Sequence, residues 1–174
     1  MAITKFNTER LSVYDWTPTT KCQDQRARLE DALKSLLTES VLQHLPPALH
    51  LNDIADGVSA WIDERDTESD VLLVERKEDG KLIGLLMLSP EEEGGRVSSV
   101  HVGYLLAETA WGRGIATELM TGLISEMMTL KPVTLVGGVD KNNPASARVL
   151  QKAGFKLDRQ NPNPDVEFYV RLIE

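Results

Sequence analysis

The chain has 174 residues, 41% of them hydrophobic and 26% charged, which is the composition of a globular protein large enough to bury a core. Its 27 acidic and 19 basic residues give a net charge of −8, which disfavours a nucleic-acid-binding or anionic-membrane-binding surface. No apolar run is long enough to span a membrane, and the polar N-terminus does not match a signal peptide. The single cysteine, Cys22, excludes an internal disulfide and a cysteine zinc cluster. We therefore expect one cytoplasmic domain, residues 1–174.

The N-terminal third predicts one strand and two helices. Residues 8–14 alternate as a strand does, and the polar segment 17–20 breaks that pattern. Apolar residues at helical spacing within 29–37 predict an amphipathic helix. A second, shorter helical face lies within 54–62, and Asn52 is its expected N-cap.

The middle of the chain predicts a hairpin and then a buried strand. Residues 71–74 and 82–88 form short apolar runs, and the Asp-Gly pair at 79–80 indicates a tight turn between them. The glutamate and glycine run at 91–95 predicts a solvent-exposed turn. Residues 100–106 are mostly apolar or aromatic, which favours a strand buried on both faces.

A glycine-containing turn follows that strand and leads into a helix. Apolar residues recur at helical spacing from 115 to 127. Between strand and helix, Gly112, Gly114 and Ala116 leave the backbone N–H groups of a helix start open to approach. Such a turn binds phosphate oxygens, although two glycines also suit an ordinary tight turn.

The last third predicts a strand, a short helix and a final strand. Residues 133–139 are apolar, Asn143 is a good N-cap, and Gly154 would end the helix as its C-terminal cap. The strands on either side of the long helix should lie parallel, joined by a right-handed crossover. With a last strand at 166–172, the prediction is an α/β (α+β) fold with a mixed, mostly antiparallel sheet and helices on both faces.

Several of these segments together resemble the GNAT superfamily of acyl-CoA-dependent N-acyltransferases. Its pyrophosphate-binding motif reads Gln or Arg, two residues, Gly, one residue, Gly or Ala, and residues 111–116 fit with Trp111 at the Gln/Arg position. That departure, the Asn-x-x-Ser of 143–146 and the Lys-Ala-Gly-Phe of 152–155 resemble the Rim-type ribosomal-protein N-terminal acetyltransferases. The opening Thr-Glu-Arg-Leu of 8–11 is also typical of this branch.

The resemblance implies a GNAT fold with a central parallel strand pair and acetyl-CoA as acyl-donor co-substrate. An amine acceptor would attack the thioester directly, without a covalent enzyme intermediate. The backbone groups of Leu105 and Leu106 would contact the acetyl carbonyl and the pantetheine. The remaining residues expected to hold acetyl-CoA are Trp111, Gly112, Arg113, Gly114, Ile115, Ala116, Asn143 and Ser146.

Two residues are candidates for proton transfer. The tyrosine that many family members use as a proton donor to the thiolate is absent, because Leu150 stands in its place. Ser146, near the positive N-terminal end of a helix, is the expected substitute, although a helix-start hydroxyl can simply bond the backbone. His101, on the strand that leads to the site, is the expected general base, since imidazole titrates between pH 5 and 8. A histidine satisfied within the core is the alternative interpretation.

A dinucleotide-binding fold is the nearest rival for the glycine turn, because Asp140 follows the next strand. However, Thr117 occupies the position of the third glycine, and too much of the chain precedes the motif. His44 and His50 have no partners at metal-ligand spacing, so no metal site is expected.

The predicted function is acetyl transfer to a primary amine, with a protein or peptide N-terminal α-amine as the favoured acceptor. Two alternatives stay open: a small-molecule amine acetyltransferase, and a non-catalytic module that binds acyl-CoA. The sequence also leaves the oligomeric state open, a homodimer included.

Overall fold

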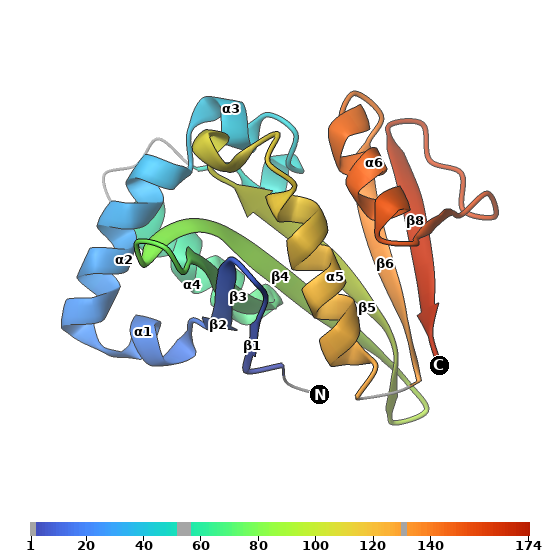
Figure 1. The fold of residues 1–174 in the computed structure, drawn as a ribbon, viewed down its shortest axis with the longest axis horizontal. Coiled ribbons are helices and arrows are strands. Elements are labelled where there is room, and N and C mark those ends of the chain that lie inside the picture. The colour runs from blue at the N-terminus through green and yellow to red at the C-terminus, as the bar shows by residue number, and fades with distance from the viewer. Residues whose placement is uncertain (1–2, 52–56, 130–131) are drawn as a thin grey trace.

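The computed structural model describes residues 3–51, 57–129 and 132–174, which contain one eight-stranded sheet (Figure 1). The strand order is β1-β2-β3-β4-β5-β6-β8-β7, and all neighbours are antiparallel except β5 and β6, which are parallel. The predicted mixed, mostly antiparallel sheet is confirmed. Its strands are β1 (Lys5–Asn7), β2 (Leu11–Asp15), β3 (Asp70–Arg76), β4 (Lys81–Glu93), β5 (Arg96–Leu106), β6 (Val133–Asp140), β7 (Lys156–Leu157) and β8 (Val166–Ile173).

Helices cover both faces of the sheet, as predicted. In Figure 1, α5 and α6 lie in front of the sheet, α4 lies behind it and α2 stands at its left end. Buried residues of α2 and α4 belong to one core. No helix in the described ranges is long and apolar enough to cross a bilayer. The helices of the described residues are α1 (Thr17–Lys21), α2 (Gln23–Leu36), α3 (Glu39–Leu42), α4 (Gly57–Glu68), α5 (Ile115–Met127) and α6 (Pro144–Lys152), with 3₁₀ turns at Pro47–Leu49 and Glu108–Ala110.

The apolar face predicted for α5 and the two ends predicted for α6 are confirmed. The apolar stripe of α5, which includes Leu119 and Leu123, is fully buried against the sheet. Asn143 caps α6, since its side chain accepts a hydrogen bond from the backbone N–H of Ser146. Gly154 follows that helix with a φ of +85°, the left-handed conformation expected of a C-terminal cap.

The sheet separates two hydrophobic cores, and β5 contributes to both. Val100, Val102 and Leu106 belong to the core under α5 and α6, whereas Leu105 belongs to the core under α2 and α4. Because side chains alternate along a strand, His101 points to the α2/α4 side. Side chains of β5 are therefore available on both sides of the sheet.

Several predicted boundaries were wrong. The strand expected at 8–14 exists as β2 but begins only at Leu11, because residues 8–10 form the turn that joins it to β1. The segment expected to be a break at 17–20 belongs to helix α1. Residues 91–93 belong to β4 and not to a loop, since the hairpin turns only at Gly94 and Gly95. These polar residues are held in the strand by pairing with β5, and the composition of the segment alone does not predict that pairing. Asn52, the expected N-cap of the second helix, and residue 54, the expected start of its apolar face, lie outside the described ranges.

Candidate active site

The parallel strands β5 and β6 pair over only three positions and then separate. Ser99 lies opposite Thr134, and the last pair in the register is His101 with Val136. Beyond it, β5 still pairs with β4 up to Leu106, and β6 still pairs with β8 up to Asp140. Each strand therefore keeps its outer neighbour while the facing edges diverge, which opens a gap at the carboxyl ends of both strands (Figure 1).

The register of β5 determines which backbone groups face this gap. The N–H of Ala107 donates to the carbonyl of Ile83 on β4 at 2.8 Å. Antiparallel pairing alternates, so the backbone groups of Leu105 also point to β4, and those of Tyr104 and Leu106 point to the β6 side. The carbonyl of Leu106 accepts a hydrogen bond from the Trp111 indole at 2.8 Å. Of the two residues expected to contact the acyl donor, Leu106 therefore turns its backbone N–H toward the gap, whereas Leu105 turns its backbone groups toward β4.

The glycine turn lies directly after β5, at the N-terminus of α5. Gly112 and Gly114 have φ values of +67° and +75°, which residues with a Cβ rarely adopt. Gly114 is the N-cap of α5 and provides no capping side chain, so the first N–H groups of the helix have no intrahelical acceptor. Ile115 is buried, so it can offer only its backbone N–H. The turn thus presents a row of donors suited to an anion.

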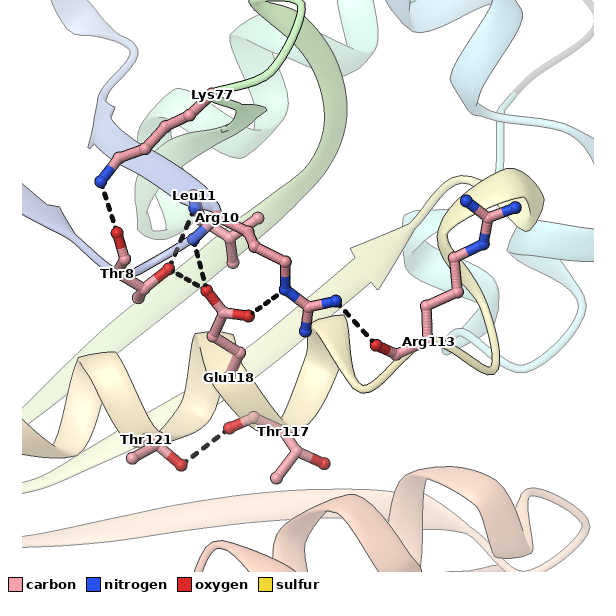
Figure 2. A network of polar contacts seen from close by, with 8 residues as sticks. All are labelled: Thr8, Arg10, Leu11, Lys77, Arg113, Thr117, Glu118 and Thr121. Carbon is pink, nitrogen blue, oxygen red and sulfur yellow. Dashed lines mark hydrogen bonds and ion pairs between the residues drawn. The ribbon is translucent and has the colours of Figure 1, made fainter.

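The turn is held in place by the N-terminal hairpin through Glu118 of α5 (Figure 2). Glu118 Oε1 accepts hydrogen bonds from Thr8 Oγ1 at 2.5 Å and from the Arg10 N–H at 2.8 Å. Glu118 Oε2 pairs with Arg10 Nε at 2.5 Å. Arg10 Nη1 also donates to the carbonyl of Arg113 at 3.0 Å, and the Arg113 side chain points away from this network.

These contacts set the ionisation of Glu118. Burial alone would raise its pKa, but the hydrogen bonds from Thr8 and Arg10 outweigh burial and hold the pKa below its usual value of 4.5. A carboxyl whose pKa is depressed on folding stabilises the folded state above its unfolded pKa. The contribution of Glu118 is therefore complete above about pH 4.5 and is lost as the pH falls through the lowered pKa.

A groove of about 680 Å³ begins at Gly114 and follows the exposed side of α5. Residues 6–8, in and after β1, form one wall. Among the described residues, Lys152 of α6 is the basic residue that lines the groove. Hydroxyl groups of α5 line the floor, from Thr117, Thr121 and Ser125. The carboxylates of Glu118 and Glu126 also line it, so the groove continues from the glycine turn along a surface of hydroxyl and carboxylate groups.

A cluster of polar side chains lies at the start of α6, on the α5/α6 side of the sheet. Asn143 Nδ2 donates to Ser146 Oγ at 3.0 Å, and the Tyr104 hydroxyl donates to the same oxygen at 3.2 Å. Asn143 and Ser146 are together, as expected. The sequence analysis did not predict that Tyr104 belongs to this cluster. Its position two residues before Leu106 puts both side chains on the same face of β5, which could have indicated it.

His101 has an acidic partner on the neighbouring strand. Its Nε2 lies 3.2 Å from Glu91 Oε1, and Ser99 Oγ donates to Glu91 Oε2 at 2.7 Å. The hydrogen bond from Ser99 and the charge of His101 both lower the pKa of Glu91. The His101 side chain is 43% exposed, so it is no satisfied core histidine. It lies at the edge of the gap, on the face opposite to Ser146 and Tyr104.

A family model described as an acetyltransferase (GNAT) domain matches residues 13–156. The chain belongs to the GNAT acetyltransferase family. This membership and the mixed α/β fold confirm the resemblance drawn from the glycine turn and the downstream motifs. Within the described residues, no three histidine, cysteine or acidic side chains gather in a group that could hold a metal ion.

Solved structures share this fold across nearly the whole chain. A probable GNAT acetyltransferase from Chromobacterium violaceum superposes with a TM-score of 0.75 at 17% identity, covering 99% of this chain and 87% of the other. The ribosomal L7/L12 alpha-N-protein acetyltransferase RimL, in complex with coenzyme A, gives 0.69 at 16%, covering 95% and 96%. The microcin C7 self-immunity acetyltransferase MccE, in complex with acetyl-CoA and AMP, gives 0.68 at 17%, covering 95% and 93%. A comparison with curated protein sequences found no match.

We predict that Arg10→Gln weakens acetyl-CoA binding more than its effect on stability explains. The variant loses the side-chain contacts of Arg10 with Glu118 and with the Arg113 carbonyl, which lowers the free energy of unfolding by roughly 1 kcal/mol for a half-exposed charged pair. Urea unfolding gives the stability, and calorimetry gives the affinity for acetyl-CoA.

Arg76→Gln is the matched control, because Arg76 also pairs with a carboxylate, that of Asp79, but in the hairpin between β3 and β4. Its acetyl-CoA affinity should equal that of the wild type. Equal affinities in both variants would show that Arg10 does not position the turn.

Proposed function

We propose that this protein transfers the acetyl group of acetyl-CoA to a primary amine. The observation that carries the proposal is the gap between β5 and β6, which leads straight to the open glycine turn at the start of α5. An extended ligand with amide groups can pair with the free strand edges, and its phosphates can bind the N–H groups of the turn. When bound, acetyl-CoA supplies an activated thioester carbon.

The residues present fit such a ligand. A Cβ added at Gly112 would have no neighbour within 4 Å, so the approach to the turn is open. The groove beyond Gly114 offers hydroxyl groups and Lys152 to the nucleotide end, and of its two carboxylates, Glu118 is already paired with Arg10 and Glu126 also lies in the lining. Lys141 is occupied with the carbonyls of Asn163 and Pro164, which makes it a poorer phosphate ligand. Structural neighbours determined with acetyl-CoA or coenzyme A support the same assignment.

Direct attack by the amine accounts for the placement of His101 and Ser146. The nitrogen lone pair forms the new bond to the thioester carbon, and His101 takes the proton that the amine gives up. The carbon–sulfur bond then breaks, and sulfur keeps the electron pair. Ser146 is the donor that stabilises the departing thiolate, near the positive end of the α6 dipole. Base and donor act from opposite faces of the sheet.

The favoured acceptor is the α-amino group of a protein or peptide. An α-amine has a reference pKa near 8, against about 10.4 for lysine, so it supplies far more free base at neutral pH. The Trp111 and Asn-x-x-Ser resemblance to the Rim-type branch points the same way. The solved structures of similar fold include an alpha-N-protein acetyltransferase and a ribosomal-protein-S5-alanine acetyltransferase from Vibrio fischeri.

Thiol release from acetyl-CoA tests both the activity and the acceptor. We expect a higher kcat/KM on short peptides with free N-termini than on the same peptides N-blocked and offering only lysine. Absence of thiol release with every amine would indicate a module that only binds acyl-CoA. Activity confined to polyamines or aminoglycosides would indicate a small-molecule enzyme and overturn the acceptor assignment.

Gly114→Val should abolish acetyl-CoA binding, because a branched side chain blocks the approach to the turn and disfavours its positive φ. Gly80→Val is the matched control, since Gly80 has a φ of +66° in the hairpin between β3 and β4. Both variants should lose roughly 1–3 kcal/mol of stability, and only the first should lose affinity. Calorimetry that finds wild-type affinity in folded Gly114→Val would refute the phosphate-binding role.

His101→Gln should lower kcat/KM at neutral pH by up to roughly a hundredfold. The deficit should shrink as the pH rises, because the acceptor amine loses its proton without help. Steady-state kinetics between pH 5.5 and pH 9.5, roughly the range of imidazole and α-amine titration, measures both effects. An unchanged rate across this pH range would assign proton removal to another group.

A further inference from the structure

Three hydrogen-bonding groups meet at Ser146, and their roles determine where its hydroxyl hydrogen can go. The Tyr104 hydroxyl donates to Ser146 Oγ at 3.2 Å, and Asn143 Nδ2 donates to the same oxygen at 3.0 Å. A serine hydroxyl has two acceptor lone pairs and one hydrogen. The two incoming hydrogen bonds therefore fill both lone pairs of Ser146.

The cap of α6 fixes these directions. Asn143 Oδ1 accepts from the backbone N–H of Ser146 at 3.2 Å, so the amide must turn its Nδ2 group, a donor only, toward the hydroxyl. A phenol is a stronger acid than an aliphatic hydroxyl, which favours donation from Tyr104 to Ser146. Among the residues that the structure describes, none accepts the Ser146 hydroxyl hydrogen.

We propose that Tyr104 is a positioning residue: together with Asn143 it fills the acceptor sites of Ser146, so that the single hydroxyl hydrogen is directed to the sulfur leaving the thioester. This inference rests on the proposed function, in which Ser146 is the donor to the thiolate. Sulfur keeps the electron pair of the broken carbon–sulfur bond and accepts the Ser146 hydrogen bond. Its proton finally comes from solvent, since a thiol, with a reference pKa of about 8.5, is a far stronger acid than serine.

The surroundings of Tyr104 suit a permanent donor. Burial raises the pKa of Tyr104 by more than the hydrogen bond with Ser146 lowers it, so the phenol keeps its proton at neutral pH. Leu150, at the position of the family tyrosine, is buried in the core, and its side chain packs over Gly137 of β6. In this chain the phenol beside the N-terminus of α6 is that of Tyr104 on β5, whereas α6 itself has Leu150 at the position of the family tyrosine.

Tyr104→Phe should lower kcat roughly three- to tenfold, the equivalent of one net hydrogen bond, and leave the KM for acetyl-CoA unchanged. Tyr14→Phe is the matched control: it also removes a phenol from the sheet, one bonded to Glu75 on β3, and should leave kcat unchanged. Wild-type kcat in a folded Tyr104→Phe protein would overturn the proposal.

A double-variant cycle tests whether Tyr104 acts through Ser146. Ser146→Ala alone should lower kcat by up to roughly a hundredfold, and adding Tyr104→Phe to it should cause no further loss. Independent, multiplicative losses would show that Tyr104 acts alone and would overturn the positioning role. Wild-type kcat in Ser146→Ala would instead refute the role of Ser146 as hydrogen-bond donor to the thiolate. The proposal that the protein transfers an acetyl group would still stand.

Asn143→Asp tests the same inference without removing the helix cap. Aspartate caps helices about as well as asparagine, so α6 should keep its thermal stability. The change replaces the Nδ2 donor by a carboxylate oxygen, which would accept the Ser146 hydrogen and hold it away from sulfur. We expect kcat to fall toward the level of Ser146→Ala. Wild-type kcat in Asn143→Asp would overturn the proposal, whatever the folding of the Tyr104 variant.

Discussion

The site depends on one constraint, the early end of pairing between two parallel strands. β5 and β6 share three register positions, and each then continues with its outer neighbour alone. Backbone groups on the two facing edges are left without strand partners, and such groups need partners when water is excluded. The glycine turn follows β5 and the Asn143 cap follows β6, so both lie where the gap opens. The topology therefore brings the glycine turn and the hydroxyl cluster to one end of the sheet.

The second requirement is a turn that keeps its shape without side chains of its own. Two glycines with positive φ give an open backbone, but they also give the unfolded chain much freedom. The N-terminal hairpin compensates for this freedom, because Thr8 and Arg10 hold Glu118 one turn into α5. A segment more than a hundred residues away in the sequence thus fixes the geometry of the binding turn (Figure 2).

Local patterns predicted much of the fold and the open backbone of the glycine turn. The cap at Asn143, the left-handed Gly154 and the apolar stripe of α5 follow from rules that act within one helix. What could not be predicted depends on how strands align. The pairing of Glu91 with His101 requires a β4 that extends to residue 93, and the fit of Leu106 in place of Leu105 depends on a register that no local pattern encodes. The contact of Tyr104 with Ser146 joins residues from two elements that meet only in the folded sheet.

The division of β5 side chains between the two faces has a consequence for the order of events. His101 lies on the α2/α4 side, whereas Tyr104 reaches Ser146 on the α5/α6 side. In the proposed reaction, the acceptor and the acyl donor would therefore occupy the site from opposite sides of the sheet and be bound together. Neither would have to leave before the other arrives, so a ternary complex would replace any acetylated form of the enzyme. In that reaction the acetylated amine would leave on the α2/α4 side and the free thiol on the α5/α6 side.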